Sequence, residues 1–352
     1  MKLFIFAPNV RSGGGLVLLK ELFLRQPSKL VSKWFLAETC GLELQSNISL
    51  FEAGFFGRLR AELSLYIESS QETIILAFHG SPTLLPVRGR QILYLQNLLL
   101  VSNISLAQYS YKTRLRLNIE RCLLKKRWGA IHLFFVQTES MNSALINFAD
   151  RYSLPKPRVI VLPFISSHFH GPRRKNKDWL QGEKQIFFYP SFFHPHKNHL
   201  NLLKAWSVFV KSDSSEFLYL TITQSQLDYI ISSNNSSDWN VRVVALGEIT
   251  HNEVLTILQN SKALVFPSAA ESFGLPLLEA KQLNVPILAS ERDFVRDVCS
   301  PIETFDPESS LSILRALRRF SGHHDSFQDV EGGAGVWNKL VDLIDSELDD
   351  CR

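Results

Sequence analysis

The chain has 352 residues, an apolar fraction of 45% that is typical of globular proteins, and a formal net charge of +4. This length gives two domains of ordinary size enough material for two cores. The four cysteines are scattered and form no Cys-x-x-Cys pair, which argues against a disulfide framework or a zinc site. No apolar run approaches the ~18 residues that span a bilayer, and the chain opens on a strand pattern instead of a signal peptide. We therefore expect a cytoplasmic protein.

Short apolar runs separated by helical patterns indicate an α/β organisation in the first half. Strands are predicted at 3–7, 73–78, 92–95, 133–136 and 158–162. Strands that alternate with helices form parallel sheets, so we expect a doubly wound domain that binds ligands at the carboxyl ends of its strands. His79 and Asn97 follow two of these strands and are candidates for contacting a substrate there. Capping of backbone groups is the alternative role for both.

Gly13, Gly14 and Gly15 follow the first strand and precede a helix predicted over residues 16–24. A glycine-rich turn at this place lets a diphosphate approach the backbone and the helix N-terminus. A dinucleotide-binding fingerprint would need another glycine at position 18, where the chain has Leu18, so the fingerprint fails. Glu38 has the position of a ribose-binding acid and keeps a dehydrogenase open as an alternative. A plain tight turn is the other alternative.

The segment Tyr109–Trp128 combines positive charge with apolar side chains. Its basic residues are Lys112, Arg114, Arg116, Arg121, Lys125, Lys126 and Arg127. Basic residues with aromatic flanks suit an anionic membrane surface, and a solvated helix packed through its leucines is the alternative. No stacking or groove-reading motif accompanies the charge, so nucleic acid is not expected as a partner.

Residues 166–179 are polar and basic and form the best linker in the chain. The second half repeats the α/β pattern, with strands predicted at 186–189, 217–221, 241–245, 263–266 and 286–289. The helix predicted over 252–258 has Asn252 as its N-cap. We therefore predict an amino-terminal domain over 1–168, a carboxyl-terminal domain over 169–330, and a tail over 331–352 whose helix packs back on the first domain.

The most informative stretch is Phe266–Ala280, which predicts a strand end, a tight loop and a helix in succession. Pro276 suits the first helical turn, where a missing N–H costs nothing. The amides of Phe273, Gly274 and Leu275 then point out of the helix N-terminus and form a seat for a phosphate group.

Two carboxylates flank this seat. Glu271 lies in the loop just before it, and Glu279 lies about one turn inside the helix. Acids beside an anion site are badly placed for phosphate alone, but they can accept hydrogen bonds from hydroxyls of a sugar joined to that phosphate. An ordinary strand-loop-helix unit with two solvated acids is the alternative.

This stretch resembles the donor site of family-4 retaining glycosyltransferases, the glycosyl transferases group 1, of the type that builds bacterial surface polysaccharides. The resemblance rests on Glu271, seven residues and Glu279, with Phe-Gly-Leu-Pro between them and Phe-Pro-Ser before them. It implies the GT-B fold, in which two doubly wound, Rossmann-like domains face each other across a cleft. It also implies a hexosyltransferase that moves a sugar from a nucleotide-sugar donor to a glycan or lipid-linked glycan acceptor, without a metal or other cofactor.

The resemblance also implies roles for single residues. Glu271 contacts the transferred sugar and acts in catalysis with Lys197, which neutralises phosphate in the same crevice. Ile249 follows the strand after which the family holds the nucleobase. The implied donor-binding set is Gly13, Gly14, Gly15, Ile249, Ser272, Phe273, Gly274, Leu275 and Glu279. His79 and Asn97 are placed on the acceptor side, and the basic segment 109–128 at the inner face of the plasma membrane.

The chain departs from the family at one expected cation. The usual pattern is Gly-Arg-Leu, three residues and Lys; Lys197 matches the lysine, but Ser191 and Phe192 stand at the glycine and arginine positions. The missing arginine keeps open a catalytically degenerate GT-B protein that binds glycan or a partner transferase. A sugar-nucleotide epimerase on the same fold is a further alternative.

Three histidines near Lys197 raise the possibility of a metal site. They are His194, His196 and His199. Pro195 interrupts them and no acid cluster follows, so we do not expect them to hold a metal ion.

Overall fold

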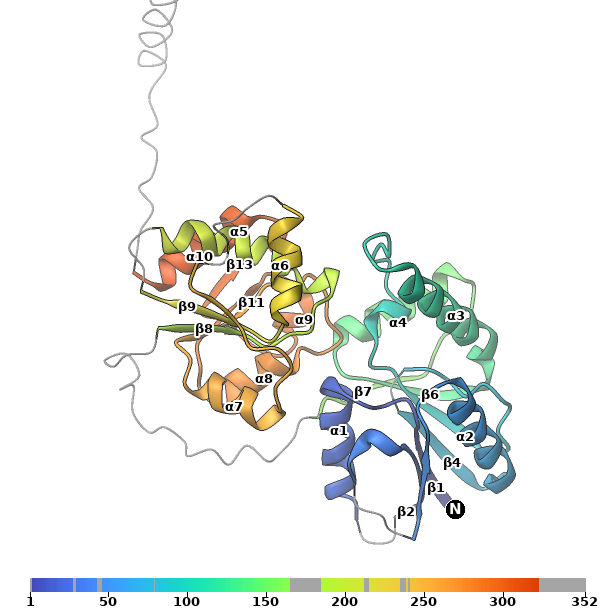
Figure 1. The fold of residues 1–352 in the computed structure, drawn as a ribbon. Helices are drawn as coiled ribbons and strands as arrows, with labels where there is room; N and C mark the ends of the chain where they lie inside the picture. Colours follow the sequence, from blue (N-terminus) through green and yellow to red (C-terminus); the bar gives the residue numbers. More distant parts are fainter. Residues whose placement is uncertain are drawn as a thin grey trace, which may run out of the picture.

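The computed structural model describes residues 2–27, 30–42, 46–78, 80–164, 185–211, 215–234, 239 and 241–322. These residues form two α/β domains that lie side by side (Figure 1). Each domain is built on one parallel sheet, so the predicted doubly wound organisation of both halves is confirmed.

The amino-terminal sheet has the strand order β3-β2-β1-β4-β5-β6-β7. Its strands are β1 (Lys2–Ala7), β2 (Val31–Ala37), β3 (Ile48–Phe51), β4 (Thr73–Phe78), β5 (Arg90–Tyr94), β6 (Ile131–Val136) and β7 (Val159–Val161). The main helices are α1 (Gly13–Leu24), α2 (Phe55–Glu68), α3 (Tyr111–Arg127) and α4 (Glu139–Arg151). In Figure 1, α1 and α4 lie toward the second domain, and α2 lies on the outer side.

The carboxyl-terminal sheet has the strand order β10-β9-β8-β11-β12-β13. Its strands are β8 (Ile186–Tyr189), β9 (Phe217–Leu220), β10 (Val243–Ala245), β11 (Ala263–Phe266), β12 (Ile287–Ser290) and β13 (Glu303–Phe305). Its helices are α5 (His199–Val210), α6 (Gln224–Ser232), α7 (His251–Gln259), α8 (Leu275–Gln282), α9 (Asp293–Arg296) and α10 (Ser310–Phe320). The central strands β8 and β11 are neighbours, so the loops that follow them open at the same edge.

Both sheets are covered on their two faces, which explains their continuous apolar strands. Every residue of β11 and β12 is buried. In the first domain, Trp34 packs with α1 on one face of the sheet, and Phe35 packs with α2 on the other. This burial leaves the strand-end loops as the polar part of each domain.

Several elements differ from their sequence-based predictions. The strands β2, β3 and β13 and the helices α2, α6 and α9 were not predicted. The strands β3 and β13 and the helix α9 are only three or four residues long and give little periodic signal. Helix α1 begins at Gly13, so the glycines form its first turn instead of a separate loop. The N-cap of α7 is Thr250 and not Asn252: its hydroxyl accepts from the amide of Glu253, whose carboxylate in turn accepts from the Thr250 amide.

The predicted linker, the predicted boundary between the domains and the predicted tail lie mostly outside the residues that the structure describes. The first sheet ends at Val161 and the second begins at Ile186, and most of the segment between them, 165–184, lies outside the described residues. The tail over 331–352 and its helix also lie outside them, as does His79. Among the residues that are described, none of the helices is long and apolar enough to cross a bilayer.

Candidate functional site

The loop between β11 and α8 carries the phosphate seat predicted from the sequence. Gly274 is the N-cap of α8 and has a left-handed backbone, with φ of 76°. A Cβ there would also lie 2.9 Å from Leu277 Cδ1, so glycine is required for both conformation and space. Pro276 stands in the first turn, as predicted. The helix N-terminus therefore presents its amides and the positive end of its dipole beyond Gly274.

Lys197 and Glu271 are brought together at this seat. Lys197 Nζ lies 2.5 Å from Glu271 Oε1, although the two residues are 74 positions apart. Their side chains are 17% and 12% exposed, so the pair is mostly buried but still reaches the surface. One comes from the loop after β8 and the other from the loop after β11, two strands that are neighbours in the sheet.

A buried tyrosine holds both members of this pair. Tyr189 Oη donates to the backbone carbonyl of Lys197 at 2.8 Å and lies 2.9 Å from Ser268 Oγ. Ser268 in turn donates to Glu271 Oε1 at 2.6 Å. Burial raises the pKa of Tyr189, which keeps its hydroxyl protonated. The charged pair is thus positioned by hydrogen bonds from groups that do not titrate near neutral pH.

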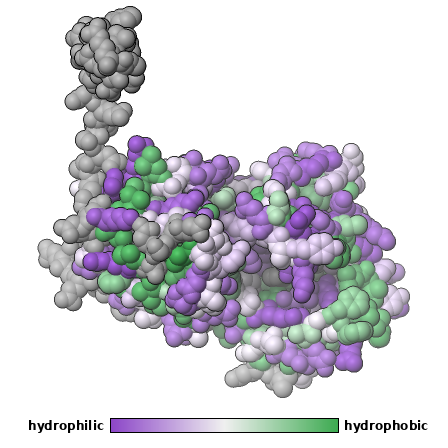
Figure 2. All heavy atoms as spheres, turned by 45° about the horizontal axis from the view of Figure 1, so that its top comes forward, coloured by the Kyte–Doolittle hydropathy of each residue, from purple (hydrophilic) through white to green (hydrophobic). Residues whose placement is uncertain are grey.

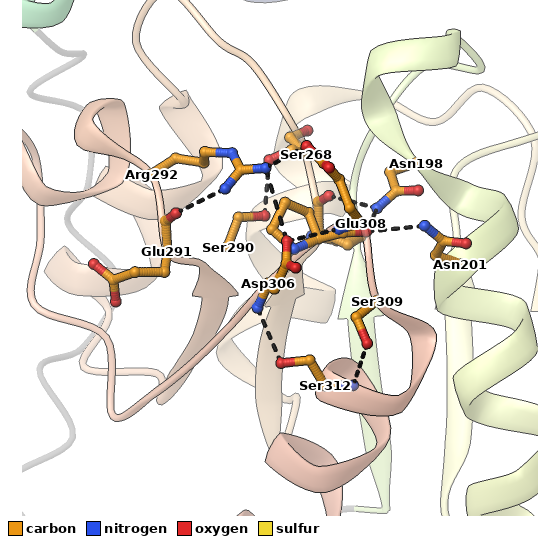
Figure 3. A network of polar contacts seen from close by, with 12 residues as sticks. Asn198, Asn201, Ser268, Ser290, Glu291, Arg292, Asp306, Glu308, Ser309 and Ser312 are labelled. Atoms are coloured by element: carbon orange, nitrogen blue, oxygen red, sulfur yellow. Dashed lines mark hydrogen bonds and ion pairs between the residues drawn. The ribbon is translucent and has the colours of Figure 1, made fainter.

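A network of hydrogen bonds holds the loop between β11 and α8 in place (Figure 3). Ser290 Oγ contacts the carbonyl oxygens of Phe266 and Ser268, at 3.2 and 2.7 Å. Asn198 Nδ2 donates to the carbonyl oxygens of Pro267 and Pro307, at 3.1 and 2.6 Å. The loops after β8, β11, β12 and β13 are therefore tied together below the site, which preorganises Lys197 and Glu271.

Glu279 is buried and pairs with a residue that the sequence did not indicate. Its Oε1 lies 2.8 Å from His251 Nε2, and the Glu279 side chain is 5% exposed while His251 is 31% exposed. His251 is the first residue of α7. It lies two residues after Ile249, in the segment that follows β10. Nothing in the local sequence marks His251, because only the packing of α7 on α8 brings it to Glu279.

The amino-terminal domain meets this site through its glycines. A Cβ on Gly13 would lie 3.0 Å from the ring of Phe192, and one on Gly14 would lie 2.7 Å from Leu275 Cδ1. Thr138 Oγ1, at the start of α4, donates to the Ser272 carbonyl at 3.1 Å. Phe192, which replaces the expected arginine, thus packs on the glycine-rich turn, and 46% of it remains exposed.

A cavity of about 220 Å³ opens beside Glu271, between the domains. The first domain lines it with Gln96, Asn97, Leu98, Leu99, Tyr109, Thr113 and Arg116, and the second with His194, His196, Ala270, Glu271 and Ser272. In Figure 2, hydrophilic side chains surround a hollow near the middle of the view. Of the two predicted acceptor-side residues, Asn97 lines this cavity, while His79 is outside the described residues.

The three histidines do not gather around one point. His199 is 2% exposed and packs on Tyr189 and Phe193, with ring centroids 5.0 and 5.9 Å away. His194 and His196 stack on each other and face the cavity. Within the described part of the chain, no three His, Cys, Asp or Glu residues are grouped so that they could hold a metal ion.

Comparison with known proteins identifies the second domain. Residues 172–322 match the family model described as glycosyl transferases group 1. The match falls on the second domain and covers less than half of the chain. This match includes Lys197, Glu271 and Glu279, the residues on which the predicted resemblance rests.

The chain is also similar to a curated protein and to solved structures. The chain is 33% identical over 159 residues to the O-antigen chain mannosyltransferase RfbU of Salmonella typhimurium, a match that covers 41% of this chain and 44% of that protein. The match thus spans less than half the length of its relative. The whole fold is similar to a UDP-forming trehalose-phosphate synthase from Burkholderia vietnamiensis (TM-score 0.62, 13% identity, 91% of this chain and 92% of that one). It is also similar to a sucrose-phosphate synthase from Thermosynechococcus elongatus (TM-score 0.64, 14% identity, 92% and 90%). The predicted GT-B fold is confirmed.

Proposed function

We propose that the protein is a retaining, metal-independent glycosyltransferase that moves a hexose from a nucleotide-sugar donor to a glycan acceptor in surface-polysaccharide synthesis. One observation carries the proposal: Lys197 pairs with Glu271 in the loop that leads into α8, and Glu271 also lines the interdomain cavity. The group 1 domain and the similarity to an O-antigen chain mannosyltransferase support it and favour mannose as the sugar.

The donor's diphosphate would lie against the amides of Phe273, Gly274 and Leu275. Lys197 would add a full positive charge beside them, and together they would stabilise the negative charge that develops on the leaving diphosphate. The backbone amides would act without reorganising during the reaction, because the hydrogen-bond network already holds their loop in place, whereas Lys197 would turn from Glu271 to the phosphate. This is the neutralising role that a metal ion has in other sugar-nucleotide enzymes.

The two glutamates would accept hydrogen bonds from hydroxyls on either side of the diphosphate. Glu271 faces the cavity and would contact the transferred sugar and steady positive charge at its anomeric carbon. Glu279 would accept from the ribose, with His251 Nε2 holding its carboxylate in place at 2.8 Å. Ile249, near the start of α7, would contact the nucleobase through its backbone.

The face of α3 suits a lipid-linked acceptor. Tyr111, Leu115 and Ile119 form a stripe at i, i+4 and i+8, and they are 76%, 47% and 59% exposed. Of the seven basic residues, Arg121 and Arg127 donate to backbone carbonyls and Lys125 lies over the Tyr152 ring, so these three belong to the fold. Lys112, Arg114, Arg116 and Lys126 are exposed. We propose that this face rests on an anionic membrane surface and brings the acceptor to the cavity.

The test is a screen of nucleotide sugars in two steps. Thermal unfolding is first measured with a panel of uridine- and guanosine-diphosphate sugars, because a ligand that binds only the folded state raises the melting temperature. The best binder, radiolabelled, is then incubated with the protein and a bacterial glycolipid extract. Transfer of label supports the proposal. Binding without transfer or donor hydrolysis would instead favour the catalytically degenerate alternative.

A further inference from the structure

Gln96 lies at the carboxyl edge of the first sheet, two residues beyond β5. The backbone before it is fixed: Leu95 N donates to the Phe135 carbonyl at 2.8 Å, and Gly80 N donates to the Tyr94 carbonyl at 3.0 Å. Gly80 has φ of 89°, and its backbone passes so close that a Cβ there would lie 3.6 Å from Gln96 N. This support directs the Gln96 side chain into the lining of the cavity.

The two polar atoms of the Gln96 side chain are buried and unpaired. Neither Oε1 nor Nε2 has a hydrogen-bond partner within the described part of the chain. Folded proteins pair the large majority of buried side-chain polar atoms, so an amide left open at both ends indicates a polar partner that binds in the cavity. An amide offers two donors and an acceptor, which matches the donor and acceptor character of sugar hydroxyls.

The neighbouring Asn97, which the sequence analysis placed on the acceptor side, has a different role. Its Oδ1 accepts from the amide of Leu99 at 3.1 Å and caps the short 3-10 helix Leu98–Leu100. The acceptor oxygen of Asn97 is therefore engaged by the backbone, which is the structural alternative for that residue. Gln96 is the one of the two whose amide nitrogen and oxygen are both buried without a hydrogen-bond partner within the described residues.

Two other residues that line the cavity contact each other across the two domains. Tyr109 Oη lies 2.5 Å from His196 Nδ1, and the two rings are nearly parallel, with centroids 6.1 Å apart. Burial lowers the pKa of His196 to about 4, so the imidazole is neutral at pH 7 and Nδ1 can accept from the tyrosine hydroxyl. Tyr109 and His196 thus line the cavity as a bonded pair, whereas Gln96 lines it with an amide that has no partner within the described residues.

We propose that Gln96 is the residue that selects the acceptor, by hydrogen bonding with both ends of its amide to hydroxyls of an acceptor sugar held in this cavity beside Glu271. The inference rests on the proposed function and deepens it. A cavity of about 220 Å³ is far larger than the roughly 30 Å³ that one water occupies, so it has room for part of a sugar ring. The donor would enter from the side of α8 and the acceptor from the side of α3, and their reacting atoms would meet at Glu271.

The test variant is Gln96→Met, which keeps the length of the side chain and removes its hydrogen-bonding atoms. Transfer is measured with the best nucleotide sugar at a fixed, saturating concentration while a bacterial glycolipid extract is titrated. We expect the half-saturating amount of extract to rise at least tenfold. The KM for the nucleotide sugar and the slow hydrolysis of that sugar by water should change less than twofold.

The matched control is Gln108→Met, since Gln108 is exposed on the segment before α3 and does not line the cavity. It should leave all three quantities unchanged. If Gln96→Met fails to fold, Gln96→Glu keeps the shape of the side chain, replaces the two donors by an acceptor oxygen and adds a negative charge, and it should also raise the half-saturating amount of extract. Unchanged acceptor saturation in a folded, active Gln96 variant would overturn this inference alone. A wild-type protein that neither transfers nor hydrolyses any nucleotide sugar would overturn the proposed function itself.

Discussion

Lys197 Nζ lies 2.5 Å from Glu271 Oε1, between loops that follow adjacent strands. This ion pair has one role in the free protein and a different one when a donor binds. Within the free protein it satisfies two charges that are only 17% and 12% exposed. When a donor binds, the same two groups would turn to its phosphate and its sugar, so the pair would have to open during each reaction cycle.

Removing either charge should abolish transfer without unfolding the protein. Glu271→Gln keeps the shape of the side chain and its contact with Ser268, and it should lower kcat about 100-fold or more because the charge beside the anomeric carbon is lost. Lys197→Met should lower kcat by a similar factor. Steady-state kinetics and the melting temperature are the measurements.

Lys262→Met is the matched control for this pair. Lys262 Nζ lies 2.6 Å from Glu216 Oε1 in the same domain, with side chains 26% and 12% exposed, but it is not near the cavity. It should cost some stability and leave kcat unchanged. Full activity in Glu271→Gln would remove the catalytic role of Glu271.

Restoring the family's arginine should strengthen donor binding. Phe192 packs against Gly13 beside the phosphate seat, and an arginine there would add charge-assisted hydrogen bonds to a diphosphate. A net gain of about 1.4 kcal/mol corresponds to tenfold tighter binding of a nucleoside diphosphate to Phe192→Arg. Calorimetry measures it, with Phe192→Leu as the control that removes the ring without adding charge. Equal or weaker binding by Phe192→Arg would place the diphosphate away from residue 192.

Acid should destabilise the protein through His199. Burial lowers its pKa to about 3 in the folded state, against an ordinary 6.5. Between these values the unfolded chain binds a proton that the folded chain does not, so stability is present above pH 6.5 and falls as the pH drops. The slope from one such group is at most about 1.4 kcal/mol per pH unit.

Replacing His199 by Phe should flatten this dependence. The ring already packs between Tyr189 and Phe193, and neither of its nitrogens has a partner within the described residues, so Phe fits chemically. Urea unfolding at pH 7 and pH 5 measures the change. His196 and His194 also have lowered pKa values, so a smaller slope should remain. His132→Phe, at an exposed position on β6, should not alter the slope, and an unaltered slope in His199→Phe would contradict the assignment.

The exposed stripe of α3 should bind anionic vesicles. We expect the protein to sediment with vesicles rich in phosphatidylglycerol and not with pure phosphatidylcholine, and the binding should weaken with salt because part of it is electrostatic. Changing Tyr111, Leu115 and Ile119 together to Ser should lower the bound fraction several-fold. The matched control changes Val208, Ile302 and Leu311, which are similarly exposed on the other domain. Equal losses in both triple variants would show that α3 is not the contact.

Much of the fold could be predicted because its strands are buried on both faces. The runs at 73–78, 186–189 and 263–266 were predicted to the residue, since continuous apolar sequence between polar loops is what such strands require. Among the missed elements, β3, β13 and α9 are only three or four residues long, and their burial depends on neighbours distant in sequence. The N-cap of α7 was placed two residues late, although Thr250 and Glu253 have the spacing of a capping box, a sequence signal that Asn252 lacks.

The sequence by itself determined the loop between β11 and α8. Its local requirements are a glycine at position 274, Pro276 in the first helical turn and two acids at fixed spacing. Only the tertiary structure decided the partners of those groups. His251 reaches Glu279, Phe192 packs on Gly13, and Tyr109 meets His196 because separate strands end at one edge and two domains face each other there. Adjacent side chains can also have different roles. Asn97 caps a backbone amide, while the amide of Gln96 has no hydrogen-bond partner within the described residues, and only the tertiary structure distinguishes the two.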